Sequence, residues 1–113
     1  MLVFLHPYKF TKFHYIRFEL DVLEKKFNDK FEIHDLSKIV NPTWLGAFKS
    51  KKHEKVKSFN SIKEWEVYFK NLSKNNKNLI VYNLLDINSF KSLIVQMKLG
   101  KYCKKIIRND DPG

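Results

Sequence analysis

The chain has 113 residues, of which 43% are hydrophobic, 30% charged and 15% aromatic. This length allows one domain with a substantial core, and the aromatic content excludes intrinsic disorder. The single cysteine, Cys103, excludes a disulfide framework within the chain and a cysteine-based zinc cluster.

The chain is strongly basic, with 22 Lys+Arg against 12 Asp+Glu and a formal net charge of +10. Only Arg17 and Arg108 are arginines, although arginine is the residue that reads phosphate and guanine in bidentate fashion. The charge therefore indicates one of two things. Either the surface has drifted in composition towards lysine, or the protein meets an anionic partner such as nucleic acid, an acidic membrane face or a phosphorylated sugar.

The first 35 residues predict a β-α-β unit. The apolar run 2–5 is typical of a strand buried on both faces, and about residues 30–35 form a second strand. Between them, apolar residues recur at helical spacing: Phe13, Ile16, Leu20, Leu23 and Phe27.

Residues 36–57 interrupt this rhythm with a long basic excursion, and loops of this length are often functional. A short strand follows at 56–59. Ser61 and Glu64 then have the spacing of a capping box that opens a helix. Its expected apolar face is Ile62, Trp65, Phe69 and Leu72.

A further buried strand is expected at 79–82, ending at Asn83. Asn88 or Ser89 can cap a third helix, for which Gly100 is the expected C-terminal stop. The expected buried face of this helix is Phe90, Leu93, Ile94 and Met97. The last strand is expected within 104–108.

The alternation of strands and helices predicts an α/β fold. We expect one three-layer Rossmann-like domain over residues 1–113, with a parallel sheet of about four or five strands and helices on both faces. The last strand is followed at once by residues 109–113. The chain is therefore expected to be either a short protein or the N-terminal part of a larger two-domain protein.

The loop after the first strand, residues 6–11, contains no glycine. A dinucleotide-binding or P-loop turn needs glycines so that the main chain can approach the phosphates. We therefore expect no nucleotide cofactor. The four histidines have no metal-binding spacing, so no metal is expected either.

In open parallel sheets, ligands bind at the carboxyl ends of the strands. This rule, with the start of the first helix, selects the candidate ligand-binding residues His6, Tyr8, Lys9, Lys12, Arg17, Asp35, Asn83 and Arg108. His6 and His14 are candidate general bases; the alternative is that they cap a helix or bond within their loop. Asp35 has capping of the following segment as its alternative.

Trp44 and Phe48 adjoin the densest basic cluster. With Lys49, Lys51, Lys52 and Lys55 they form a candidate membrane or anion contact. The alternative is that the two aromatic residues pin a long loop to the core. The N-terminus lacks the features of a signal peptide and no apolar run is long enough to span a membrane. We therefore expect a cytoplasmic protein that can touch the inner membrane face.

Three segments carry a family resemblance: residues 4–10 (FLHPYKF), 13–20 (FHYIRFEL) and 32–36 (EIHDL). Their succession resembles the front of bacterial surface-carbohydrate (capsular polysaccharide or lipopolysaccharide) biosynthesis proteins, which resemble the N-terminal half of GT-B-fold glycosyltransferases. The resemblance implies that the first loop and the 36–57 excursion face a sugar acceptor. It also implies that a donor-binding half is missing, and it assigns no catalytic residue.

The leading hypothesis is an acceptor-side domain of a glycosyltransferase-like protein in cell-surface polysaccharide biosynthesis. Its partners would be a lipid-linked or phosphorylated sugar acceptor, an anionic membrane surface, and a second polypeptide or domain that supplies the donor. One alternative is a basic nucleic-acid-binding module, disfavoured by the scarcity of arginine. Another is a small flavodoxin- or receiver-like protein without the usual phosphate loop.

Overall fold

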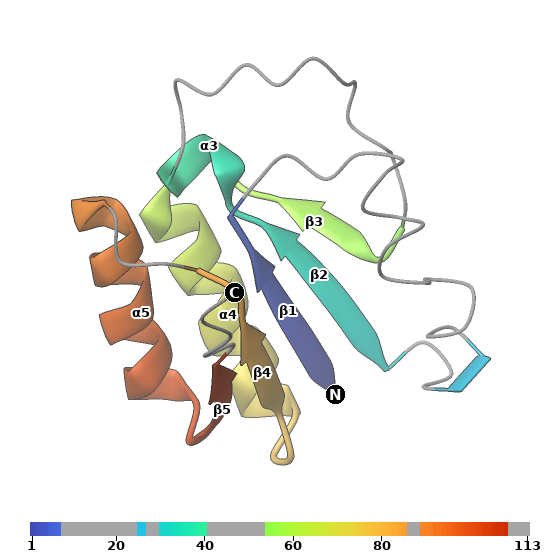
Figure 1. Cartoon of the computed structure of the whole chain (residues 1–113). Helices are drawn as coiled ribbons and strands as arrows, with labels where there is room; N and C mark the ends of the chain where they lie inside the picture. Colours follow the sequence, from blue (N-terminus) through green and yellow to red (C-terminus); the bar gives the residue numbers. More distant parts are fainter. Residues whose placement is uncertain (8–24, 27–29, 41–53, 86–88, 109–113) are drawn as a thin grey trace.

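The computed structural model describes residues 1–7, 25–26, 30–40, 54–85 and 89–108 (Figure 1). They form a five-stranded parallel sheet in the order β3-β2-β1-β4-β5. The strands are β1 (Leu2–His6), β2 (Phe31–Asp35), β3 (Val56–Ser58), β4 (Ile80–Asn83) and β5 (Lys105–Arg108). The predicted Rossmann-like α/β fold is confirmed.

The central strand β1 pairs with β2 on one side and β4 on the other. Leu2 is the register partner of both Phe31 and Ile80. Successive side chains of a strand point to opposite faces of the sheet. Val3 and Leu5 accordingly enter the larger core cluster, whereas Phe31 and Ile33 form a second cluster on the opposite face.

Helix α4 (Ile62–Asn75) follows β3 and covers the face that carries Val3 and Leu5. It begins as predicted, with the Glu64 amide donating to the Ser61 hydroxyl oxygen at 3.2 Å. The Glu64 carboxylate accepts from the Asn60 amide at 3.3 Å, one residue before the Ser61 amide that it would bond in a standard capping box. Trp65 and Phe69 are buried, with stacked rings 5.0 Å apart. Two of the four residues on the expected apolar face are thus fully buried.

Helix α5 (Phe90–Tyr102) lies beside α4 on the same side of the sheet (Figure 1). Ser89 caps it, accepting from the Ser92 amide at 3.1 Å. The expected stop at Gly100 is wrong, because the helix runs on to Tyr102 and the Cys103 amide donates to the Leu99 carbonyl at 3.0 Å. Cys103 itself is buried in the core, as a small apolar residue would be.

The expected buried face of α5 is also wrong. Phe90, Leu93 and Met97 are 76%, 44% and 69% exposed. The residues that face the sheet are Ser92, Val95, Gln96 and Leu99. Both sets recur at spacings of three and four, so periodicity alone could not choose between them. The structure turns inward the side whose two polar residues find buried hydrogen-bond partners.

The 36–57 excursion begins as helix α3 (Ser37–Val40), whose Ile39 and Val40 are buried in the core, and ends in β3. The helix expected over 13–27, and with it the layer on the other face of the sheet, falls almost entirely on residues that are not described. Among the described residues, no helix is both long enough and apolar enough to cross a membrane.

The α4 capping box gives a direct test of the fold. Ser61→Ala should lower the free energy of unfolding by about 1 kcal/mol, because the Glu64 amide loses its acceptor. Urea unfolding followed by circular dichroism measures this. Ser73→Ala is the control, since Ser73 only donates to the Lys70 carbonyl inside the helix. Equal stability of the Ser61 variant and the wild type would mean that the cap does not form.

Candidate functional site

Four of the predicted site residues end neighbouring strands. His6 ends β1, Asp35 ends β2, Asn83 ends β4 and Arg108 ends β5. The register pairs His6 with Asp35 and Asn83 with Arg108, and it sets Leu5 opposite Asn83. The four residues therefore lie along the carboxyl edge of the sheet as two pairs on opposite faces, His6 with Asp35 and Asn83 with Arg108. We call them the carboxyl-edge row (His6, Asp35, Asn83 and Arg108).

The carboxyl-edge row spans the point where the strand order reverses. From β1 the chain moves outward through β2 to β3, and it then crosses back to place β4 on the other side of β1. Connections leave such a point in opposite directions and open a crevice, which is where ligands bind in open α/β sheets. His6 and Asn83 end the two strands that flank the reversal, and both are buried.

A chain of amide hydrogen bonds holds Asn83. Its Nδ2 donates to Gln96 Oε1 at 3.1 Å, and its Oδ1 accepts from the Leu85 amide at 3.0 Å. Gln96 Nε2 in turn donates to the Ser92 hydroxyl at 3.3 Å. Both amide orientations are fixed by their partners, so Asn83 has a rigid base beneath α5.

Arg108 is tied to the same base from the edge strand. One guanidinium nitrogen, Nη1, donates to Gln96 Oε1 at 3.4 Å. A guanidinium has five N–H donors in a planar fork, and the Arg108 side chain is exposed. It can therefore present donors to an anion while one nitrogen stays anchored to Gln96.

Asp35 caps the segment that follows it, which was the alternative to ligand binding. Its Oδ1 accepts from the Ser37 amide at 3.0 Å and so opens α3. This contact orders the turn after β2, where the Leu36 amide also donates to the His6 carbonyl at 2.9 Å. Asp35 therefore orders the turn after β2, and its carboxylate is engaged by the backbone.

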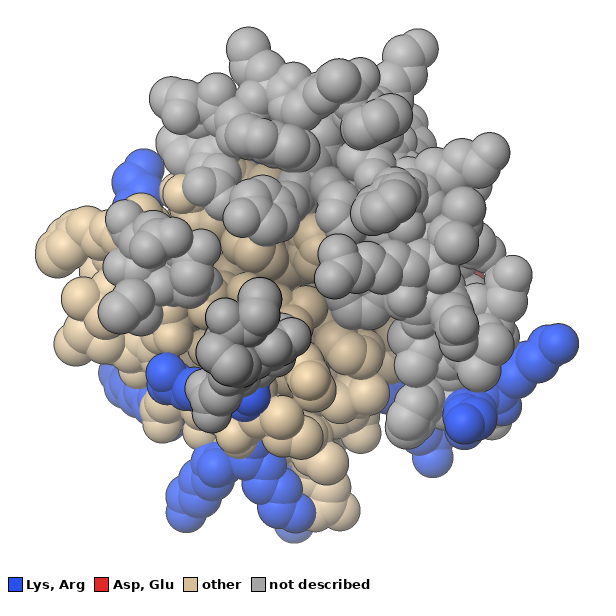
Figure 2. Space-filling view, viewed as in Figure 1, with Lys and Arg blue, Asp and Glu red and all other residues tan. Residues whose placement is uncertain are grey.

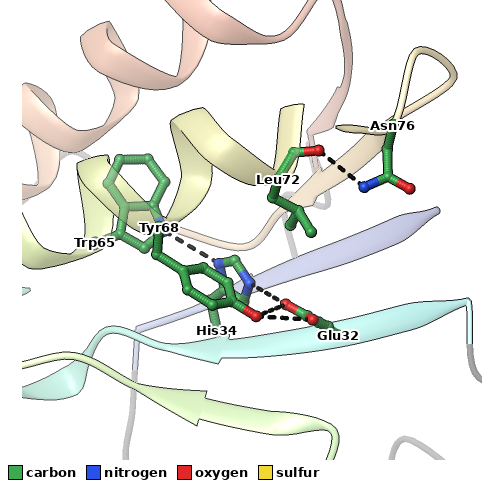
Figure 3. A network of polar contacts seen from close by, with 6 residues as sticks. All are labelled: Glu32, His34, Trp65, Tyr68, Leu72 and Asn76. Carbon is green, nitrogen blue, oxygen red and sulfur yellow. Dashed lines mark hydrogen bonds and ion pairs between the residues drawn. The ribbon is translucent and has the colours of Figure 1, made fainter. Parts of the chain in front are cut away.

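A second polar network, centred on His34, lies under α4 (Figure 3), and its His34 and Trp65 are fully buried. His34 precedes Asp35 on β2 but points to the opposite face. The Trp65 indole Nε1 donates to His34 Nδ1 at 3.1 Å, so the imidazole proton sits on Nε2. That nitrogen contacts Glu32 Oε1 at 3.0 Å. Both ring nitrogens are thus occupied by protein groups.

Burial lowers the pKa of His34 below its usual 6.5, an effect that the hydrogen bond to Glu32 only partly opposes. For Glu32, burial raises the pKa, but the hydrogen bonds from His34 and Tyr68 outweigh it and leave the carboxyl below its usual 4.5. The Tyr68 hydroxyl donates to both Glu32 oxygens, at 2.8 and 2.9 Å. A neutral, fully bonded imidazole cannot take a substrate proton, so the network joins sheet to helix and is structural.

Of the other predicted site residues, Lys55 immediately precedes β3, and its carbonyl accepts from the Ile33 amide at 2.8 Å. It thus lies at the amino end of the sheet, opposite the carboxyl-edge row. The rest fall outside the described residues: Tyr8, Lys9, Lys12, His14, Arg17, Trp44, Phe48, Lys49, Lys51 and Lys52. Within the described ranges, no group of three His, Cys, Asp or Glu residues could hold a metal ion.

The structure adds Gln96 and Ser92 to the site, which sequence reasoning missed. They are polar residues four apart on a helix, opposite its apolar stripe. That spacing places both polar residues on one side of the helix, but it indicates a buried polar contact only once Asn83 is known to lie beneath α5.

The His34 network predicts a pH dependence of stability. The pKa of His34 is lowered in the folded protein, so as the pH falls below about 6.5 the unfolded chain binds a proton at residue 34 before the folded protein does. The free energy of unfolding should therefore decline between about pH 7 and pH 5, and His34→Gln should flatten that decline. Urea unfolding at several pH values measures the slope.

Imidazole ¹⁵N shifts of the wild type give a second readout of the same network. They should show His34 as a neutral Nε2–H tautomer at pH 6. An imidazolium at that pH, or an unchanged slope in His34→Gln, would contradict this account.

We compared the chain with protein-family models, with curated proteins and with solved structures, and none of them matches it. The resemblance to surface-carbohydrate biosynthesis proteins therefore stays a prediction. The carboxyl-edge row is the feature of the structure that bears on function.

Proposed function

We propose that the chain is the acceptor-side domain of a glycosyltransferase-like protein in bacterial surface-polysaccharide biosynthesis. It would work in the cytoplasm at the inner membrane face, with a second polypeptide or domain that holds the sugar donor. One observation carries the proposal: β1, β2, β4 and β5 all end in polar residues, which lie along the carboxyl edge of the sheet on both sides of the strand-order reversal.

The chemistry of the row suits a sugar with an attached phosphate. Asn83 and Gln96 are buried and bonded to one another, and Gln96 holds Arg108, the one exposed residue of the row. Arg108 adds planar charge-assisted donors of the kind that bind phosphate. The net charge of +10 would draw such an anion towards the molecule.

The described part of the row supports binding more than chemistry. Asp35 is engaged by the backbone of α3, and the neutral amides of Asn83 and Gln96 cannot exchange protons near pH 7. An acceptor-binding domain needs no more than this if the partner supplies the donor. This reading agrees with the glycine-free first loop, which offers no nucleotide-phosphate turn.

On the face that Figure 2 shows, the distribution of charge does not favour the nucleic-acid alternative. The Lys and Arg side chains of the described residues stand there at several separate places. A nucleic-acid interface would gather them along one track that follows the phosphate backbone.

Arg108→Gln tests the proposed anion contact. Removing one charge-assisted contact should weaken binding of hexose 1-phosphate or a polyprenyl-diphosphate sugar about tenfold, which corresponds to about 1.4 kcal/mol. Isothermal titration calorimetry measures it. Lys105→Gln is the matched control, because it removes the same charge from the amino end of the same strand. Equal losses in both variants would point to general attraction, and no binding by the wild type would refute the proposal.

A further inference from the structure

The outward side of α5 carries an apolar stripe, which we define as Phe90, Leu93, Ile94 and Met97. Phe90 and Met97 are 76% and 69% exposed, and their spacing of seven residues places both on the side opposite the buried Val95 and Leu99. Monomeric proteins seldom expose several large apolar side chains together unless the patch has a role. The stripe therefore needs a partner.

Helix α4 lies alongside, and its outward side is basic. The two helices are joined by Glu66, which accepts from Lys98 Nζ at 3.0 Å and from the Tyr102 hydroxyl at 3.0 Å. The exposed residues of α4 at spacings of four, three and four form what we call the α4 row: Lys63, Val67, Lys70 and Lys74. This spacing puts the three lysines and Val67 on one side of the helix.

No acidic residue of α5 offsets this charge, because the helix contains none. It carries the exposed Lys91 and Lys101 near its two ends. On α4, Glu66 is paired with Lys98, and the Glu64 carboxylate lies at the cap, bonded to the Asn60 amide. The outer surface of the two helices therefore combines an apolar stripe with an excess of positive charge.

We propose that the outer side of α4 and α5 is a docking surface for an anionic lipid membrane. Apolar side chains with flanking lysines are typical of helices that lie in the membrane interface, where Phe and Leu enter the acyl boundary and Lys meets acidic headgroups. The stripe forms a convex helix surface. A deformable lipid layer can pack around such a surface, whereas a protein partner needs a groove of matching shape.

The docking surface and the carboxyl-edge row share α5. The helix is the next element after β4, and the Ser92 and Gln96 of its inner side hold Asn83 of the row. A lipid-linked phosphate at the membrane surface would then lie near Arg108. This step rests on the proposed function, and it names the lipid surface that would present the acceptor.

Vesicle flotation tests the docking surface with the full chain. Vesicles of phosphatidylcholine with phosphatidylglycerol should bind the protein, and pure phosphatidylcholine vesicles should bind it at least tenfold less. The double variant Phe90→Gln/Met97→Gln should also lose at least tenfold in binding to the anionic vesicles. Its fold should persist because both residues are exposed, and Ile107→Gln, which removes an exposed apolar residue from β5, is the control.

The lysines have their own matched pair. Lys63→Gln/Lys70→Gln should weaken binding, and Lys77→Gln/Lys104→Gln, at the amino end of the sheet, should weaken it less. Equal binding to neutral vesicles, or unchanged binding in Phe90→Gln/Met97→Gln, would overturn the proposal. So would a dimer in analytical ultracentrifugation that this variant abolishes, because a second copy would then cover the stripe.

The docking surface and the sugar-phosphate site can be rejected independently of one another. Calorimetry with hexose 1-phosphate uses no lipid, so intact sugar-phosphate binding without vesicle binding would reject only the membrane surface. Vesicle binding without sugar-phosphate binding would reject only the proposed acceptor role.

Discussion

The buried hydrogen bond between Trp65 and His34 fixes the helix that the whole topology depends on. Helix α4 carries the chain from β3, at one edge of the sheet, across β2 and β1 to β4. Its attachment to β2 runs through three polar groups: the Trp65 indole, the His34 imidazole and the Glu32 carboxylate that also accepts from Tyr68 (Figure 3). Burying a polar group costs free energy unless the group is hydrogen-bonded. Any other position of α4 on the sheet would break these bonds and is therefore disfavoured.

The reversal in strand order follows from that crossover, and the candidate site follows from the reversal. Once β4 lies beside β1, Asn83 comes next to the carboxyl end of β1 and beneath α5. Its need for a buried partner turns Gln96 and Ser92 inward, and this rotation leaves Phe90, Leu93 and Met97 facing outward. The rigid base of the row and the apolar stripe are therefore two sides of one helix orientation.

Sequence reasoning succeeded where the determining contacts are local. The strands, the Ser61–Glu64 box and the Ser89 cap rest on residues a few positions apart, and the carboxyl-end rule placed His6, Asn83 and Arg108 correctly at strand ends. It failed for α5, where the buried face is set by a bond spanning 13 residues between Asn83 and Gln96. The role of His34 depends on Trp65, 31 residues away, and no local sequence pattern predicts that the two side chains are in contact.

The central claim is that the described edge of the sheet between β1, β4 and β5 binds a sugar phosphate. Its most direct test is an amide-resolved NMR titration of the ¹⁵N-labelled protein with hexose 1-phosphate, which locates the ligand without substitutions. The account predicts that the largest shifts fall at the strand ends around His6, Asn83 and Arg108 and at the start of α5. Shifts confined to the amino ends of the strands, around Leu2, Ile80 and Lys105, would contradict it.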